Sequence, residues 1–275
     1  MNKNSNAYII TYATVMVVVV ALVLAFASLS LQDRQNANVE NEMKGAILQT
    51  IGEGRDADKV KDKTAYVNEQ YAKYIVEDFA VNTQGDRIEG ANAFELLKNL
   101  KSEYDKPAAE RELPIFVSRS DDGTIRYILP LWGSGLWGPV WGYLAMESDW
   151  NTISGAVFDH QGETPGLGAE IATPVFQDQF RGKTIFRDGK FVSVAVTKGE
   201  GSSAGNGQAV DAISGGTITS RGVENMLRDN LGDYLPYIEK AKMQALPDAI
   251  PAVGGVTPGV AEADGTETSN TESDE

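Results

Sequence analysis

The sequence contains no cysteine and only one histidine, His160. Without cysteine the chain cannot form disulfides, thiolate metal sites, iron–sulfur clusters or a cysteine nucleophile. A single histidine leaves little basis for a zinc site or a Ser-His-Asp triad. The sequence therefore predicts no metal site and no catalytic side chain of its own.

Positive charge is also scarce. The chain has 24 lysines and arginines against 39 aspartates and glutamates, which gives a formal net charge of −15. Nucleic-acid binding needs a basic surface to neutralise phosphates, so this composition argues against nucleic acid as a partner.

Residues 7–31 form a run of 25 positions without a charged, amide or histidine side chain. At about 1.5 Å per residue, a helix of this length exceeds the roughly 30 Å hydrocarbon core of a membrane. A cleaved signal peptide is the alternative, since Ala25-Phe26-Ala27 resembles a cleavage site. We favour an uncleaved transmembrane helix for two reasons. The run is longer than the usual apolar segment of a signal peptide, and Lys3 alone is a poor basic n-region.

The charges that flank this helix orient it weakly, with Lys3 before it and Asp33 and Arg34 after it. The absence of cysteine suits an oxidising compartment. We therefore expect residues 1–6 in the cytoplasm and the bulk of the chain outside.

The remaining chain divides by composition into a connector, a main domain and a tail. Apolar residues at helical spacing predict that 32–70 is a helical stalk or connector, with Gly52 or Gly54 ending its first helix. The main domain is expected over 71–246. The stretch 247–275 is rich in proline, glycine and acid, so we expect a disordered, dispensable tail.

Turn signals between β-rich runs predict an antiparallel sheet. Residues 113–119 and 125–132 flank a Ser-Asp-Asp-Gly-Thr turn, 140–147 and 152–159 form the next pair, and Asp188-Gly189 marks another hairpin. A short helix is expected over 174–180, and a longer one carries the stripe Val223, Met226, Leu227 and Leu231. The predicted fold class is α+β: a largely antiparallel sheet with flanking helices, preceded by one transmembrane helix.

The stretch DAISGGTITS, residues 211–220, crowds four hydroxyl side chains and two glycines before that helix. One interpretation is helix capping by Thr219 or Ser220. The other is a phosphate held at the start of the helix, where free N–H groups and the helix dipole favour an anion. The stretch lacks the spacing and lysine of a P-loop, so a nucleoside triphosphate is not expected. Taken alone, the pattern favours capping.

Two other stretches bear on this choice. Residues 129–147, LPLWGSGLWGPVWGYLAME, place Trp132, Trp137 and Trp141 among glycines, either as core residues or as a wall for a planar ligand. Residues 160–168, HQGETPGLG, contain a Pro-Gly turn signal. As a lone turn, this segment is a solvated loop.

Together with QDRQNAN after the apolar run, these stretches resemble the C subunit of the Na⁺-translocating NADH:quinone reductases, to which the G subunit of the Rnf complexes is related. The resemblance implies one FMN, attached by a phosphoester to the last hydroxyl residue of a D-x-x-[ST]-G-A-[TS] motif. On this chain Asp211 is the leading acid, Ser214 and Gly215 follow, and Thr217 is the acceptor. Thr219 is the alternative acceptor, although it falls outside the register of the motif. Gly216 departs from the family's alanine, a change expected to loosen the loop without blocking attachment.

The resemblance also implies the residues that contact the flavin, and to these we add two from the tryptophan-containing stretch. Lys198 and Arg221 are further candidates to steady the phosphate. The implied contacts are Glu163, Thr164, Leu167 and Gly168, and the two additions are Leu136 and Trp137.

The implied function is a membrane-anchored electron carrier in a complex that passes electrons from NADH to quinone and exports Na⁺. Its expected partners are the other membrane subunits and a flavin transferase, and its expected location is the cell inner membrane with the main domain in the periplasm. Three alternatives stay open: an Rnf-type subunit, a free-standing periplasmic flavin reductase, and a non-redox anchored binding module.

Overall fold

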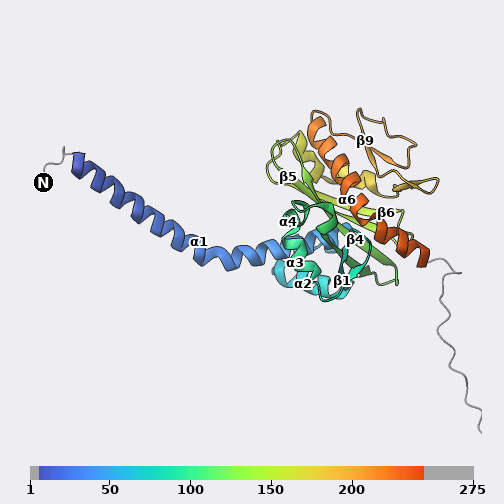
Figure 1. Ribbon diagram of the computed structural model, residues 1–275, viewed down its shortest axis with the longest axis horizontal. Coiled ribbons are helices and arrows are strands. Elements are labelled where there is room, and N and C mark those ends of the chain that lie inside the picture. Colours follow the sequence, from blue (N-terminus) through green and yellow to red (C-terminus); the bar gives the residue numbers. More distant parts are fainter. Residues whose placement is uncertain (1–5, 245–275) are drawn as a thin grey trace, which may run out of the picture.

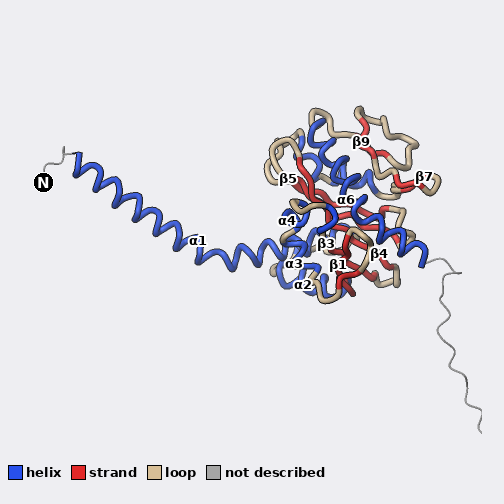
Figure 2. The backbone as a smooth tube through the Cα atoms, in the orientation of Figure 1, coloured by secondary structure: helices blue, strands red, loops and turns tan. Residues whose placement is uncertain are grey.

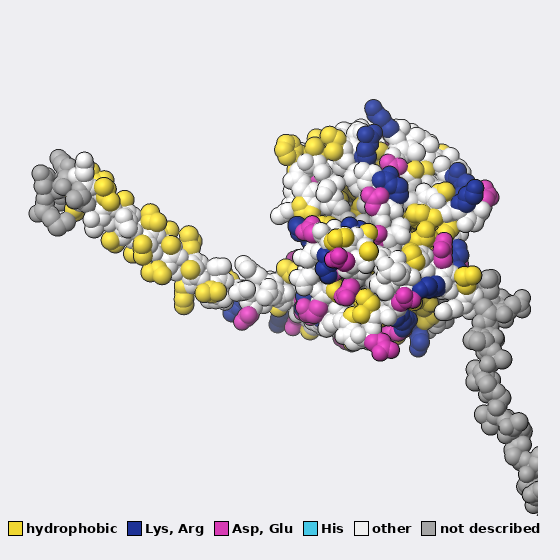
Figure 3. Space-filling view, viewed as in Figure 1, with side chains coloured by type: hydrophobic (Ala, Val, Ile, Leu, Met, Phe, Trp, Pro, Cys, Tyr) yellow, Lys and Arg dark blue, Asp and Glu magenta, His cyan; other side chains and the backbone are white. Residues whose placement is uncertain are grey.

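A computed structural model describes residues 6–244 of the chain. One long helix projects from a domain that contains both helices and a sheet (Figure 1). The predicted tail, 247–275, lies outside the described residues. Helix α1, Asn6–Thr50, contains an 18-residue window with a mean hydropathy of 2.7, none of it buried. Apolar side chains cover this part of α1 (Figure 3). Its length and composition are compatible with the predicted membrane span.

Helix α1 continues without a break through residue 31 and ends inside the domain. Ile47 and Leu48, in its last turns, are fully buried. The chain then turns at Gly52, which has a φ of 87°, consistent with the predicted end. Part of the stretch assigned to the connector therefore contributes to the core, as does Val67 of α2, Lys63–Tyr74.

The domain is built on a six-stranded antiparallel sheet in the order β2-β1-β3-β4-β5-β6. The predicted hairpins are present as β3 with β4 and as β5 with β6, joined by short turns. The strands are β1 Ile75–Asn82, β2 Arg87–Ile88, β3 Glu112–Arg119, β4 Ile125–Ser134, β5 Pro139–Glu147 and β6 Ile153–His160.

Helices cover both faces of this sheet (Figure 2). On one face lies α6, Thr217–Gln244, and all four residues of its predicted stripe are buried. On the other lie the end of α1 and the short helices α3, Ala93–Lys98, and α4, Leu100–Tyr104. Strand β5 alternates between them, with Leu144 packed toward α6 and Tyr143 toward α1. The predicted α+β class is confirmed.

Shorter elements complete the domain near the start of α6. The expected short helix is present as α5, Pro174–Gln177, and η4, Asp178–Phe180. The Asp-Gly hairpin joins β7, Phe186–Arg187, to β8, Lys190–Phe191. Strands β9, Ala195–Thr197, and β10, Ala209–Asp211, pair in parallel, unlike the sheet. The remaining 3₁₀ turns are η1 Ala57–Lys59, η2 Ala108–Glu110 and η3 Gly168–Ala172.

Candidate functional site

The DAISGGTITS stretch forms a tight turn that leads directly into α6. Gly215 has a φ of 75°, which favours glycine, and the Gly216 N–H donates to the Ile213 carbonyl at 3.1 Å. The Ser220 N–H donates to the Gly216 carbonyl at 2.9 Å, so α6 begins at Thr217 with Gly216 at the cap position. The expectation that Thr219 or Ser220 is the cap is wrong, because both lie inside the first turn.

The four hydroxyl side chains of this stretch separate into two buried and two exposed groups. Thr219 and Ser220 are 1% and 2% exposed. The Ser220 Oγ accepts from the Ile213 N–H at 3.0 Å, and the Thr219 Oγ1 donates to Glu163 Oε2 at 2.6 Å. Ser214 and Thr217 are exposed. Of the two, Thr217 stands at the first position of the helix, beside the N–H groups that lack helical partners.

Glu163 joins the HQGETPGLG loop to the two other motif stretches. Its side chain is 5% exposed. One oxygen, Oε1, accepts from the backbone N–H of Trp137 at 2.9 Å. The other, Oε2, accepts from the Thr219 hydroxyl. The Glu163 N–H donates to His160 Nδ1 at 3.2 Å. The structure therefore brings together three stretches that are far apart in the sequence.

Glycines permit this close approach. A methyl group added at Gly135 or at Gly168 would collide with the Glu163 carboxyl oxygens, and one at Gly222 of α6 would collide with the Ser134 carbonyl. These glycines let the β4–β5 turn, the loop and α6 meet without intervening side chains. Gly133, Gly135 and Gly138 have the spacing G-x-G-x-x-G, but they connect two strands and open no helix, so they are not a dinucleotide fingerprint.

An apolar rim surrounds the start of α6. Trp137 is 66% exposed, Ile218 is 59% exposed, and Leu136 and Leu167 are close to half exposed. Large apolar side chains with this exposure are typical of a binding surface. Ile218 was not predicted from the sequence. The signal that the sequence offers for Ile218 is its position next to Thr217, the expected acceptor.

The tryptophan-containing stretch is divided between one face of the sheet and the β4–β5 turn. Trp132 and Trp141 stack with ring centroids 5.9 Å apart and planes 12° apart, and both pack against the cluster on the α1 side. Only Trp137 of the three belongs to the β4–β5 turn near Glu163. The core interpretation therefore holds for Trp132 and Trp141, while the exposed Trp137 leaves the ligand-wall interpretation as a prediction.

Asp211, the leading acid of the motif, holds the glycine-rich loop between β9 and β10. Its carboxylate accepts from the Gly201 N–H at 2.6 Å, from the Ser203 N–H at 2.8 Å and from the Ser202 hydroxyl at 3.2 Å. These donors, the Ser203 N–H foremost, lower the pKa of Asp211. Thr164, Lys198 and Arg221 are exposed.

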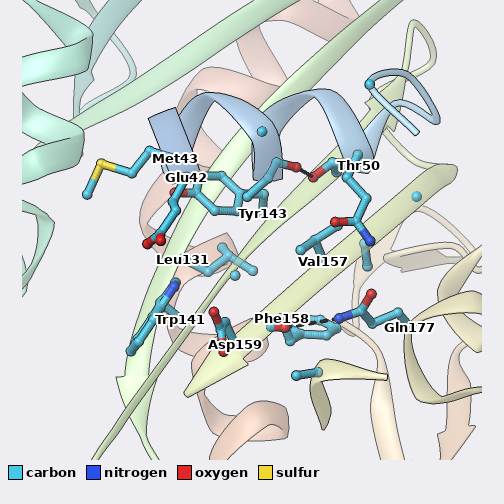
Figure 4. A pocket seen from close by; sticks show the side chains of 18 of the residues that line it. Glu42, Met43, Thr50, Leu131, Trp141, Tyr143, Val157, Phe158, Asp159 and Gln177 are labelled. Atoms are coloured by element: carbon cyan, nitrogen blue, oxygen red, sulfur yellow. Dashed lines mark hydrogen bonds between the residues drawn. The ribbon is translucent and has the colours of Figure 1, made fainter. Parts of the chain in front are cut away.

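A pocket of about 1280 Å³ lies elsewhere, between α1 and the edge of the sheet formed by β5 and β6 (Figure 4). Glu42 and Met43 of α1 face Trp141 and Asp159 of the strands across it. Trp132 and Trp141 line this pocket, but none of the predicted cofactor-binding residues does. The pocket is therefore separate from the apolar rim around the start of α6, which is the candidate surface for the flavin.

Three comparisons relate the chain to known proteins. A family model described as an FMN-binding domain matches residues 135–232, which include every predicted cofactor-binding residue. The C subunit of the Na(+)-translocating NADH-quinone reductase of Haemophilus ducreyi is 30% identical over 259 residues, 89% of this chain and 97% of the relative. The corresponding protein of Neisseria meningitidis serogroup B is 30% identical over 88% of this chain and 96% of its own length.

Two solved structures share the fold. The crystal structure of the C subunit of the Na(+)-translocating NADH-quinone reductase from Parabacteroides distasonis is 43% identical with a TM-score of 0.64, covering 76% of this chain and 96% of that one. The crystal structure of Shewanella oneidensis NqrC is 26% identical with a TM-score of 0.61, covering 74% and 97%.

Proposed function

Because the chain belongs to the family formed by the C subunits of the Na⁺-translocating NADH:quinone reductases, we propose that it is the FMN electron carrier of such a complex. In this role it relays electrons from NADH toward ubiquinone or menaquinone, coupled to Na⁺ export. The names of the relatives favour the quinone reductase over the Rnf-type subunit. The FMN-binding family model favours a redox protein over a non-redox binding module.

The residues around the start of α6 fit FMN. The exposed apolar side chains of Trp137, Leu136 and Leu167 offer a surface for a planar ring system. Glycines 215 and 216 let the backbone approach a ligand closely, and the first turn of α6 offers N–H groups to a phosphate. FMN would supply the electron-transfer chemistry, while these residues bind and orient it.

The observation that carries the attachment site is the exposure of Thr217 at the first position of α6. We propose that a flavin transferase joins FMN to this hydroxyl as a phosphoester: the Thr217 oxygen would attack the phosphorus of a flavin donor activated as a phosphoanhydride, the anhydride bond would break, and its leaving group and the hydroxyl proton would depart. The helix dipole would offset the charge of the phosphodiester. The covalent link would spare the cofactor the entropy cost of rebinding and prevent its loss. Ser214 is the other exposed hydroxyl of the motif and is the alternative acceptor.

The proposed location is the cell inner membrane, with α1 crossing it once and the domain in the periplasm. Other membrane subunits would supply the NADH-oxidising site and the ion path, because the apolar run 7–31 of α1 carries no charged, amide or histidine side chain that could line a path for an ion. Lys198 and Arg221 are proposed to steady the phosphate by charge.

The test is the intact mass and peptide map of the membrane-extracted protein, co-expressed with its flavin transferase. We expect the mass of FMN less water on the peptide that contains Thr217. Thr217→Ala should abolish the added mass, while Ser214→Ala should retain it. Label retained in Thr217→Ala and lost in Ser214→Ala would move the acceptor to Ser214. An unlabelled wild-type protein, with a known transferase substrate labelled in parallel, would reject covalent attachment.

A further inference from the structure

Glu163 lies where three segments of the proposed flavin site converge. Its own loop carries Leu167, the β4–β5 turn carries Trp137, and the first turn of α6 carries Thr217. A side chain that contacts all three segments can set how they lie relative to one another, whether or not it touches the ligand.

The carboxyl group of Glu163 is occupied by neutral donors from the two other segments. The Trp137 N–H binds Oε1 at 2.9 Å and the Thr219 hydroxyl binds Oε2 at 2.6 Å. In the described part of the chain, no salt bridge joins Glu163 to a basic side chain. A buried polar group with such partners is costly to disturb, since removing it leaves the donors unsatisfied.

Two glycines pack closely against the carboxyl group of Glu163. Gly135 of the turn and Gly168 of the loop face the two carboxyl oxygens so closely that a methyl group on either would collide with them. The same methyl group on Gly168 would lie 2.5 Å from Thr219 Oγ1. The carboxyl group therefore sits in a slot shaped by the segments that it joins.

Helix geometry connects this slot to the proposed acceptor. Successive residues of an α-helix are about 100° apart around the axis, so residues 217 and 219 point to nearly opposite sides. Anchoring Thr219 inward through Glu163 therefore fixes the rotation of the first turn that turns Thr217 outward. The observed burial agrees, with Thr219 1% exposed and Thr217 exposed.

We propose that Glu163 is a positioning residue that holds Trp137 and the proposed acceptor Thr217 in fixed relation, through its bonds to the Trp137 N–H and Thr219. The proposal builds on the function proposed above. It assigns to Thr219 the role of partner to Glu163, and to Glu163 a role within the protein framework.

Two pairs of variants test this arrangement in the full-length protein. Glu163→Ala removes both bonds, whereas Glu163→Gln keeps them, since the amide oxygen accepts from the Trp137 N–H and the amide nitrogen donates to Thr219 Oγ1. Thr219→Val removes the hydroxyl at constant shape, whereas Thr219→Ser keeps it. Glu170→Ala is the control, because Glu170 lies just after the loop that carries Glu163 and is half-buried. Among described contacts its carboxylate accepts only from the Gly166 N–H, at 3.1 Å.

The first readout is amide hydrogen exchange of Trp137 in the protein without flavin. We expect exchange to be faster by about tenfold or more in Glu163→Ala, the effect of losing one buried hydrogen bond. Glu163→Gln and Glu170→Ala should stay close to wild type. Unchanged exchange in the central strands β3 and β4 would show that the fold is intact. Unchanged Trp137 exchange in Glu163→Ala would overturn the proposal.

The second readout is the rate of FMN attachment by the transferase, with the visible circular dichroism of the attached flavin. We expect Glu163→Ala and Thr219→Val to attach FMN about tenfold more slowly and to alter the flavin spectrum, and Glu163→Gln and Thr219→Ser to restore both. Alanine and glutamine variants that match each other in rate and spectrum would overturn the proposal. If wild type accepts no FMN while the exchange pattern holds, the proposed function fails and the positioning role within the fold stands.

Discussion

At the residue scale, close packing around Gly216 explains why this chain has glycine where the family motif has alanine. Gly216 is buried, and a Cβ added there would lie 3.0 Å from Ile213 Cγ2 and 3.3 Å from the Gly168 nitrogen. Both distances are tighter than ordinary van der Waals contact. The missing methyl group therefore accommodates the close approach of the loop, a reason that the sequence-based expectation of a looser turn did not include.

We predict that Gly216→Ala destabilises the domain by about 1 kcal/mol, the low end of the cost of overpacking. Thermal unfolding of the detergent-solubilised protein measures this change. Gly162→Ala is the control, because no atom lies within 4 Å of its added Cβ. Equal unfolding temperatures for the two variants would show that Ile213 moves aside without cost.

The hydrogen bonds of Asp211 lead to a second prediction at the residue scale, which concerns the pH dependence of those bonds. Hydrogen bonds from Ser203 and Gly201 lower its pKa below the ordinary value of 3.8. A lowered folded-state pKa means that the bonds contribute fully above the unfolded value and are lost as the pH falls through the folded value. We expect the amide resonances of Gly201 and Ser203 to titrate below 3.8 and to lose this transition in Asp211→Asn. A transition above 3.8 would contradict the assignment.

At the scale of elements, α6 and the β4–β5 turn meet through Gly222. An alanine there would collide with the Ser134 carbonyl, whereas Gly232, further along the same helix, has no atom within 4 Å of an added Cβ. The two positions share a backbone conformation and differ in what surrounds them. The helix must therefore shift away from the sheet to accept a methyl group at Gly222. A methyl group at Gly232 requires no shift.

We predict opposite effects for alanine at these two glycines. Gly222→Ala should destabilise the domain by about 1–3 kcal/mol through overpacking. Gly232→Ala should stabilise it by about 0.5–1 kcal/mol, since glycine is the poorer helix former. Denaturant unfolding of the two variants beside wild type measures both changes. A stabilising Gly222→Ala would contradict the close approach of α6 and the turn.

The same scale explains how far the sequence predicts the fold and the site. The β3–β4 hairpin, the Asp188-Gly189 turn and the stripe of α6 were predicted because local turn chemistry and short-range periodicity specify them. The parallel pairing of β9 with β10 and the contact of Glu163 with Thr219 were missed. Glu163 and Thr219 are 56 positions apart, so no local pattern contains their contact. The pairing of β9 with β10 depends on the course of the loop between them, which their short strands do not specify. The exposure of Thr217, with Thr219 buried, is likewise a tertiary outcome.

At the scale of the molecule, α1 links the predicted membrane span to the core without a break. The same helix carries exposed apolar side chains near its start and the fully buried Ile47 and Leu48 near its end. Composition predicts that the membrane span ends at residue 31 and that the main domain begins at residue 71. Packing places the beginning of the folded domain earlier than residue 71, within the last turns of α1.

Deletions from the N-terminus separate these two boundaries. We predict that a chain starting at residue 36 folds and accepts FMN as the full-length protein does, because residues 9–35 of α1 are exposed and contribute nothing to the core. A chain starting at residue 52 should lose its cooperative unfolding transition, because Ile47 and Leu48 are each worth about 2–5 kcal/mol and a domain has only about 5–15 kcal/mol to lose. Thermal unfolding and FMN incorporation are the measurements. If the shorter chain unfolds at the same temperature as the longer one, the end of α1 is a passive stalk and the core begins after it.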